Sequence, residues 1–254
     1  MNPSRTPLIA GNWKMYNGGQ SSVALAAGVV AFAKDLPTVD VVVAPPYTAL
    51  AAVSAEIHGS RVGLAGQNLY PKPEGAYTGE ISGPFLAECG CSWVIVGHSE
   101  RRQYFAETDA LVADKVAAAL KSGLVPIVCV GETLEQREKG ETLRVVKQQV
   151  EAFLDVIAQA SEAVAIAYEP VWAIGTGKTA GPKEAEEVHA AIRTWLSSKA
   201  ENLAARTRIL YGGSVKPDNA AAILACPNVD GALVGGASLD PGSFGAIARA
   251  AVAK

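Results

Sequence analysis

The chain has 254 residues, of which 49% are hydrophobic and 19% are charged, with a formal net charge of −3 and a pI near 5.7. This composition fits one large α/β domain over residues 1–254 and needs no linker or second domain. The weak negative charge provides no basic surface for nucleic acid or anionic lipid, so an anion has to be bound by a local site. A small-molecule ligand is therefore favoured.

Cysteine and histidine give no sign of a metal centre. The four cysteines lie mostly in apolar runs, and Cys89 and Cys91 are separated by one residue, which disfavours a zinc site or a redox dithiol. The N-terminal segment lacks a signal-peptide core, and no uncharged apolar run reaches the roughly 18 residues of a membrane span. We expect a cytoplasmic protein with reduced thiols.

Eight short apolar runs, many of them rich in β-branched residues, are typical of buried strands. They are Leu8–Asn12, Val39–Ala44, Val62–Gln67, Trp93–Gly97, Val125–Val130, Ala163–Tyr168, Arg208–Tyr211 and Gly231–Val234. The stretches between them place apolar residues at helical spacing, as in Val188, Ile192, Trp195 and Leu196. Strands that alternate with helices and carry little charge predict a parallel sheet covered by helices.

Eight such units of about 32 residues each predict a single (β/α)8 TIM barrel, with eight parallel strands surrounded by helices. A doubly wound open sheet is the alternative architecture, but the glycine fingerprint Gly-x-Gly-x-x-Gly is absent after the first run. Local signals support the expected breaks: Thr133 and Gln136 can form a capping box, and Pro182 suits the first turn of a helix.

Polar side chains stand where several predicted strands end. Glu169 directly follows the sixth run, and Ala163, Ala165 and Ala167 share its face of that strand. The same alternation pairs Asn12 with Lys14, His98 with Glu100, and Leu233 with Gly235. Each polar residue alone could be an exposed charge or a satisfied core group. Together at the carboxyl ends of parallel strands, where such barrels hold their active sites, they predict one catalytic rim.

Two glycine-rich turns follow the last two strands and indicate a phosphate site. Tyr211-Gly212-Gly213-Ser214 follows the seventh run, and Val234-Gly235-Gly236 follows the eighth. Glycine lets backbone N–H groups approach an anion, and barrels often bind phosphate at these two loops. Two tight βα turns are the alternative, but Gly175 offers a third backbone donor after Glu169, which favours phosphate binding.

Four segments in chain order together resemble the triosephosphate isomerase family. They are Gly11-Asn12-Trp13-Lys14, residues 95–102, residues 167–177, and Tyr211-Gly212-Gly213-Ser214-Val215. The resemblance covers essentially the whole chain. It implies an isomerase of glycolysis and gluconeogenesis that interconverts dihydroxyacetone phosphate and D-glyceraldehyde 3-phosphate through an enediolate, with no metal or organic cofactor.

The resemblance also implies residue roles. Glu169 resembles the base that moves a proton between C1 and C2, His98 the electrophile that polarises the carbonyl, and Lys14 the cation beside the phosphate and enediolate. The matching substrate-binding positions are Asn12, Lys14, Gly175, Ser214, Gly235 and Gly236. The matching supporting positions are Glu100 and Cys129, together with Ile174 and Leu233 as an apolar clamp around the base.

Two further segments match parts of that family. Residues 170–180 match a mobile lid, although Gly181 stands where the family commonly has a hydroxyl residue capping the next helix. The long connection 68–80 matches a loop that inserts into a second subunit and places Thr78 near that subunit's active site, so a homodimer is expected. From length and composition alone, an exposed Ω-type loop is the alternative.

Two other functions compete with an isomerase. Another phosphate-binding barrel, such as a sugar-phosphate synthase, epimerase or aldolase, is one; an aldolase would need a desolvated lysine on an inner strand, whereas Lys14 lies at a rim. A barrel that only binds a phosphate ligand or acts as a scaffold is the other. Such a protein would not need Glu169 or His98, and both are present.

Overall fold

The computed structural model describes residues 5–160, 164–173 and 180–252. Its strands are β1 Leu8–Asn12, β2 Asp40–Ala44, β3 Gly63–Gly66, β4 Trp93–Val96, β5 Val125–Val130, β6 Ala165–Tyr168, β7 Arg208–Tyr211 and β8 Gly231–Val234. Each strand pairs in parallel with the next, and β8 pairs with β1 to close the barrel. The predicted (β/α)8 TIM barrel is thereby confirmed.

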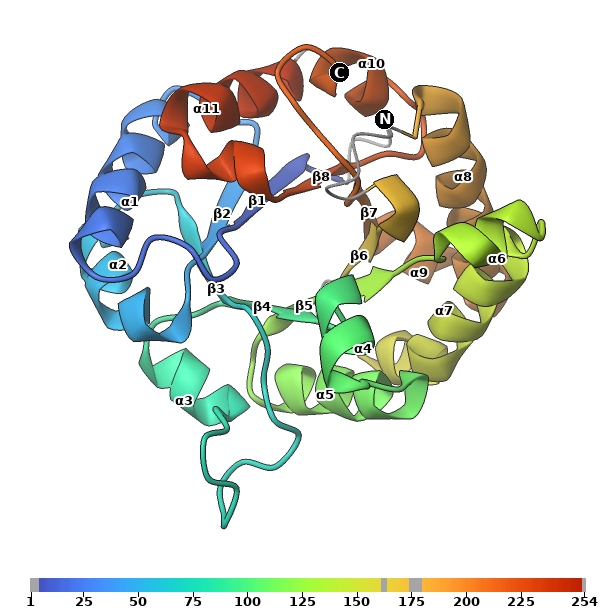
Figure 1. The fold of residues 1–254 in the computed structure, drawn as a ribbon, viewed down its shortest axis with the longest axis horizontal. Helices are drawn as coiled ribbons and strands as arrows, with labels where there is room; N and C mark the ends of the chain where they lie inside the picture. Colours follow the sequence, from blue (N-terminus) through green and yellow to red (C-terminus); the bar gives the residue numbers. More distant parts are fainter. Residues whose placement is uncertain (1–4, 161–163, 174–179, 253–254) are drawn as a thin grey trace.

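Helices form a ring around the strands (Figure 1). The α-helices are α1 Gln20–Ala33, α2 Leu50–Ile57, α3 Gly83–Glu88, α4 Ser99–Phe105, α5 Asp109–Lys121, α6 Leu134–Glu138, α7 Thr142–Gln159, α8 Pro182–Lys199, α9 Glu201–Arg206, α10 Ala220–Leu224 and α11 Pro241–Ala250. The 3-10 helices in the described part of the chain are η1 Tyr47–Ala49, η2 Val171–Ala173 and η3 Gly236–Leu239. Within the described ranges, none of these helices is long and apolar enough to span a membrane.

The predicted strands agree closely with the observed ones. Four coincide in both bounds, and the predicted start of the sixth, Ala163, lies outside the described residues. The fourth strand ends before Gly97 because that residue adopts a φ of +69°, outside the strand region. The third ends before Gln67, whose side chain instead donates to the backbone carbonyl of Ala44 at 2.8 Å. The predicted capping box at Thr133 and Gln136 is present at the start of α6.

The residues of each strand divide between two buried clusters. In β6, Ala165 and Ala167 belong to the smaller cluster and Ile166 and Tyr168 to the larger one, as the alternation predicts. All eight strands contribute to the smaller cluster, which fills the barrel interior: Leu8, Ala10, Val42, Ala44, Ala65, Ile95, Ile127, Cys129, Ala165, Ala167, Leu210 and Leu233. The larger cluster joins the outer faces of the strands to the helices, and it contains Trp13. Small inward residues leave room inside a closed barrel.

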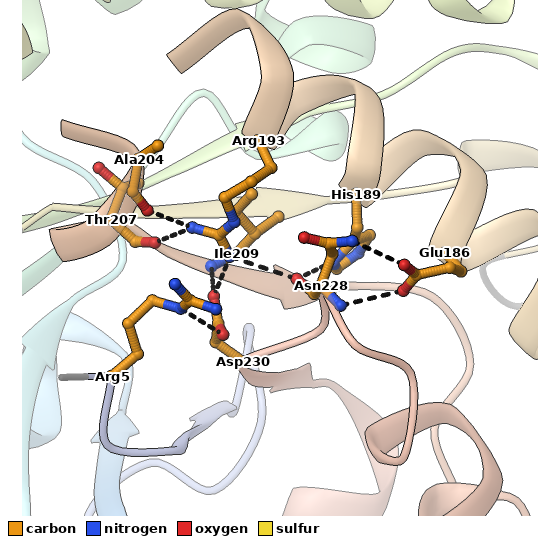
Figure 2. A network of polar contacts seen from close by, with 9 residues as sticks. All are labelled: Arg5, Glu186, His189, Arg193, Ala204, Thr207, Ile209, Asn228 and Asp230. Atoms are coloured by element: carbon orange, nitrogen blue, oxygen red, sulfur yellow. Dashed lines mark hydrogen bonds and ion pairs between the residues drawn. The ribbon is translucent and has the colours of Figure 1, made fainter. Parts of the chain in front are cut away.

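The amino-terminal end of the barrel, here called the closed end, carries a network of ion pairs and hydrogen bonds, which Figure 2 shows. Asp230 directly precedes β8 and is fully buried. Its carboxylate accepts from Arg5 Nε at 2.8 Å and from the Ile209 N–H at 2.9 Å, and it pairs with Arg193 of α8. Arg193 also donates to the carbonyl of Thr207 at 2.5 Å. The network ties β7, β8, α8 and the segment before β1 together.

A long connection between β3 and α3 projects from the ring of helices (Figure 1). Residues 72–80 are all exposed. The base of the connection is fixed, because the Tyr70 N–H donates to the Ile81 carbonyl at 2.8 Å and Tyr70 forms a parallel bridge with Ser82. The connection has the length and exposure of a protruding arm and not of a tight turn.

Candidate active site

Glu169 emerges from the carboxyl end of β6 and is only 2% exposed. One carboxylate oxygen lies 2.9 Å from His98 Nε2, and the other accepts the backbone N–H of Ser99 at 2.9 Å. The backbone N–H of Glu169 donates to the Val130 carbonyl at 2.7 Å and so continues the ladder between β5 and β6. A buried carboxylate is thus held by two donors from the start of α4.

Two glycines make room for Glu169. A Cβ on Gly131 would lie 1.7 Å from the Glu169 carbonyl oxygen, and a Cβ on Gly212 would lie 2.8 Å from Glu169 Cγ. The first contact is with backbone and cannot be relieved by a side-chain rotation. The sequence therefore keeps both neighbouring strand ends bare where Glu169 turns into the barrel mouth.

His98 is the N-cap residue of α4, and this position defines which ring nitrogen carries the proton. Nδ1 accepts the backbone N–H of Glu100 at 3.3 Å, so the hydrogen-bond pattern assigns the proton to Nε2, which donates to Glu169. Burial lowers the pKa of His98, but the Glu169 charge and hydrogen bond outweigh burial and raise that pKa above its usual range. The protonation of His98 therefore depends on where Glu169 lies.

Glu169 experiences the reverse balance. Burial alone would raise the pKa of its carboxyl group, but the contacts with His98, the Ser99 N–H and the charge of Lys14 lower that pKa below its ordinary value. Glu169 is therefore ionised at neutral pH and has the charge required of a general base. The same carboxylate raises the pKa of the Cys129 thiol, which burial in β5 already raises.

Lys14 follows β1 in a left-handed conformation with a φ of +50°, which is unusual for a residue with a side chain. Its N–H donates to Asn12 Oδ1 at 3.0 Å, and its carbonyl accepts from Gln67 Nε2 at 2.8 Å. Its ammonium group lies 2.5 Å from Glu100 Oε1. The hydrogen bonds offset the cost of the conformation, on the order of 1–3 kcal/mol, and hold the lysine at the rim.

These residues line one cavity of about 740 Å³ at the carboxyl end of the barrel. One wall consists of Asn12, Lys14, His98 and Glu169, with Leu233 of β8 beside them. The remaining wall is rich in glycine backbone and is made by residues 212–218 and 235–237 together with Ser243. The predicted residues Ser214, Gly235 and Gly236 all lie there. Among the described residues, no group of three or more His, Cys, Asp or Glu could hold a metal ion.

The two flanks of segment 174–179 are anchored by hydrogen bonds. Before it, the buried Glu132 accepts from Trp172 Nε1 at 2.9 Å and from the Tyr168 hydroxyl at 3.1 Å. After it, the Tyr211 hydroxyl donates to the Ala180 carbonyl at 3.2 Å. Ile174 and Gly175, predicted to act as clamp and phosphate donor, lie outside the described residues.

Not every predicted position lies at the cavity. Thr78 lies on the exposed arm between β3 and α3, and it is not among the residues that line the cavity of its own chain. Glu100 and Cys129 adjoin the site through Lys14 and Glu169 and do not line the cavity themselves. Cys129 is fully buried in the barrel interior, whereas the Glu100 side chain is 40% exposed.

Sequence reasoning missed several residues of the site. The Ser99 N–H, the Gln67 amide and the exposed Lys216 were not singled out, although all three hold or line the cavity region. Gln67 could have been found, because it is a polar residue at the carboxyl end of a predicted strand. A backbone donor such as Ser99 leaves no side-chain signal, and an exposed lysine is the commonest surface residue type.

Comparison with known proteins agrees with this geometry. A sequence model described as triosephosphate isomerase matches residues 7–251. A triosephosphate isomerase of Chloroflexus aurantiacus is 53% identical over 242 residues, covering 94% of this chain and 97% of the relative. That of Moorella thermoacetica is 53% identical, covering 96% and 98%, and that of Rhodopirellula baltica is 52% identical, covering 98% of both. The chain belongs to the triosephosphate isomerase family.

Proposed function

We propose that Glu169, His98 and Lys14 are the catalytic residues with which this chain, as a member of the triosephosphate isomerase family, interconverts dihydroxyacetone phosphate and D-glyceraldehyde 3-phosphate. The observation that carries the proposal is the cavity itself: an ionised buried carboxylate, an Nε2–H donor and a cation line it together with a wall rich in glycine backbone. This arrangement suits a substrate with an acidic carbon at one end and a phosphate at the other.

The proton step follows from the positions of these groups. A Glu169 oxygen removes a proton from C1 of the ketone and becomes a carboxylic acid, while the C–H electron pair moves into the C1–C2 bond as an enediolate forms. The His98 Nε2–H donates to the developing oxyanion and Lys14 stabilises its charge. The hydroxyl proton on O1 then passes to O2, and the electron pair that it leaves forms the C1=O bond. The C1–C2 π electron pair takes the proton back from Glu169 at C2, which completes the aldose without loss or gain of atoms.

The contact of Glu169 with His98 is a resting arrangement in this mechanism. When the carboxylate leaves His98 for the substrate, the largest influence that raises the histidine pKa is lost, and the Glu100 carboxylate, 3.6 Å from Nδ1, is the one that stays. The Glu100 N–H still points at Nδ1. A helix amino terminus disfavours an imidazolium, so the ring that meets the carbonyl is neutral. Nε2 remains a donor and Nδ1 remains an acceptor throughout.

The phosphate group is bound by the glycine-rich wall. Ser214, Gly235 and Gly236 offer backbone N–H groups at the cavity, and a Cβ on Gly235 would lie 3.5 Å from Lys14 Cε. Backbone donors next to a lysine form a suitable site for a dianion. Family resemblance assigns Gly175 to phosphate binding as a further backbone donor. It assigns Ile174, together with Leu233, to a clamp that excludes water from the base.

We further propose that residues 170–180 form a lid over the substrate. The hydrogen bonds of Trp172 to Glu132 and of Tyr211 to Ala180 fix the two ends of this segment to the barrel, which supports hinges at those ends. A closed lid would keep water from the enediolate and thereby prevent the elimination of phosphate. Deleting residues 173–176 should shift the product towards methylglyoxal and inorganic phosphate, which phosphate release measures directly.

The protein is proposed to act as a homodimer. Several large apolar side chains are exposed between β1 and α1, on the arm, in α3 and in α4. They are Met15, Tyr16, Tyr77, Phe85, Tyr104 and Phe105, with Met15 94% exposed. Exposed apolar surface of this kind supports a protein interface on this side of the molecule. The arm that carries Thr78 would then insert beside Asn12 and Lys14 of the second copy.

Sedimentation combined with the assay tests the dimer. Shortening residues 71–79 should give monomers with strongly reduced kcat, because Lys14 and His98 lose packing that fixes their geometry. A wild-type protein that sediments as a fully active monomer at nanomolar concentration would contradict the proposal. So would a shortened monomer with undiminished turnover.

We also propose that residues 1–254 act as a single domain in the cytoplasm. Pairing of β8 with β1 joins the two ends of the described chain in one barrel, which supports a single unit. All four cysteines are free thiols, which suits a reducing compartment.

The direct test of the reaction is a coupled assay of the purified protein with dihydroxyacetone phosphate. Binding of 2-phosphoglycolate should raise the melting temperature and inhibit competitively, while glycolate, which lacks the phosphate, should do neither. Absence of isomerase activity in a folded protein would refute the function. Equal stabilisation by the two compounds would refute the phosphate site alone.

A further inference from the structure

One exposed lysine at the cavity mouth has no part in the mechanism above. The titratable groups that line the cavity are Lys14, His98, Glu169, Lys216 and Asp218. Lys14 is paired with Glu100, and Glu169 is paired with His98. Lys216 is exposed and forms no ion pair with any residue that the structure describes, so its charge is available to an incoming ligand.

The backbone that carries Lys216 is fixed relative to the phosphate wall. The Asn219 side chain accepts the Lys216 N–H at 2.8 Å and donates to the Ser214 carbonyl at 3.0 Å. The Lys216 carbonyl accepts from the Asn219 N–H at 3.2 Å and the Ala220 N–H at 3.0 Å, at the start of α10. The charge of Lys216 therefore stands on a rigid turn two residues beyond Ser214.

We propose that Lys216 is a capture residue, which attracts the phosphate dianion of the substrate to the cavity before the glycine-rich wall binds it. This inference rests on the proposed function. A chain with a net charge of −3 repels a dianion at long range, and a cation at the mouth offsets that repulsion where the ligand enters. Asp218 lies on the same turn and opposes the attraction, so the two side chains set the local potential together.

The exposure of Lys216 defines how this effect has to behave. An exposed charge acts through solvent and is screened over about 8 Å at physiological salt. Lys216 should therefore raise the rate of substrate association, and the effect should be largest at low ionic strength. The loss on its removal should appear in kcat/KM and not in kcat, because a bound substrate no longer needs to be captured. A substrate without the phosphate should be indifferent to Lys216.

The test measures kcat/KM for three variants, each of which replaces a charged side chain by a neutral amide, at about 10 mM and about 300 mM ionic strength. Lys216→Gln should lower kcat/KM for dihydroxyacetone phosphate about threefold at low salt, and Asp218→Asn should raise it about twofold, as expected for exposed charges. Lys34→Gln is the matched control, because Lys34 is exposed at the end of α1, which lies towards the closed end of the barrel. At high salt, the kcat/KM values of all the variants should become equal to that of the wild type.

Two further measurements keep the outcome decisive. Binding of inorganic phosphate at low salt should weaken about threefold in Lys216→Gln, whether or not the protein turns over, while the isomerisation of uncharged D-glyceraldehyde should not change. A Lys216→Gln variant that behaves like Lys34→Gln, or whose loss persists at high salt or with D-glyceraldehyde, would overturn the inference. Failure of the wild-type protein to isomerise triose phosphates would instead overturn the proposed function.

Discussion

A buried carboxylate stands next to a strand at each end of the barrel, Asp230 at one end and Glu169 at the other, and the two have different roles. Asp230 directly precedes β8 at the closed end, and Glu169 directly follows β6 at the open end. Both side chains are almost completely buried. Asp230 is paired with two guanidinium groups and accepts one strand N–H. Glu169 instead contacts the imidazole of His98, which can be neutral or protonated, and accepts one N–H of α4.

The partners decide what each carboxylate can do. Arginine stays charged and its fork holds a carboxylate in a fixed geometry, so Asp230 cannot leave its partners without leaving buried charges behind. His98 can lose its contact with Glu169 and still keep its own hydrogen bond to Glu100. A buried carboxylate is thus structural where its removal would leave its partners with unpaired buried charges. It is available for chemistry where its partners keep other hydrogen bonds.

The largest effect is expected at the closed end. Asp230→Asn removes the charge that Arg5 and Arg193 share, and breaking a buried ion pair from one side costs about 3–5 kcal/mol of unfolding free energy. Urea unfolding measures the loss. The kcat of the fraction that remains folded should stay near that of the wild type, because the network lies at the opposite end from the cavity. A variant of unchanged stability would show that the network is not what closes this end.

A catalytic loss without a stability loss is expected at the open end. Glu169→Asp withdraws the carboxylate by one methylene, and a base about 1 Å out of place can cost on the order of 10²-fold in kcat. The KM should change far less and the urea midpoint should stay close to the wild type. Steady-state kinetics measure kcat and KM, and a urea unfolding curve of the same variant measures its stability. Undiminished kcat would exclude Glu169 as the base.

The pH dependence of stability sharpens the contrast further. Because the folded-state pKa of Glu169 is lowered, its stabilising contribution is present above the unfolded pKa of about 4.3 and is lost as pH falls through the folded value. The stability difference between the wild type and Glu169→Gln should therefore shrink as pH is lowered from 5 towards 3. Urea midpoints across that range give the test. A difference that grows on acidification would mean that burial, and not His98 and Ser99, dominates the pKa of Glu169.

The sequence predicted what depends on alternation and on strand ends. Strand β6 shows why: Ala165 and Ala167 alternate with Ile166 and Tyr168, so the inward face and the direction of Glu169 follow from residue size and period alone. The barrel then follows from the repetition of such units. The residues assigned by family resemblance, such as Cys129 and Leu233, have no pattern of their own that separates them from ordinary core residues.

Long-range side-chain pairing lay beyond such reasoning. Arg5 and Asp230 are 225 positions apart, and Glu169 meets the Ser99 N–H across 70 positions. Periodicity identifies the element on which a residue lies but not the partner that it finds across the barrel. Gly131 is similar, because its lack of a side chain matters only through the close approach of the Glu169 backbone from the next strand.

The smallest effect is expected at the start of α8, the helix that begins after the proposed lid and carries Arg193 into the closed-end network. Gly181 caps α8 with a φ of −77° and a ψ of 175° and offers no side-chain hydrogen bond to it. Gly181→Ser places a hydroxyl at this cap and should raise stability by a few tenths of a kcal/mol. A new Cβ would lie 2.8 Å from Glu184 Oε2, the end of a flexible side chain that can rotate away.

The matched control is Gly181→Ala, which makes the same contact with Glu184 but has no hydroxyl to cap the helix, and it should be less stable than Gly181→Ser by about 0.5–2 kcal/mol. Because the change affects only the amino terminus of α8, it should leave the ion pairs of Arg193 intact. Any effect on turnover should then appear as slower opening or closing of the lid. Equal stability of the serine and alanine variants, measured by thermal unfolding, would show that the amino terminus of α8 gains nothing from a side-chain cap.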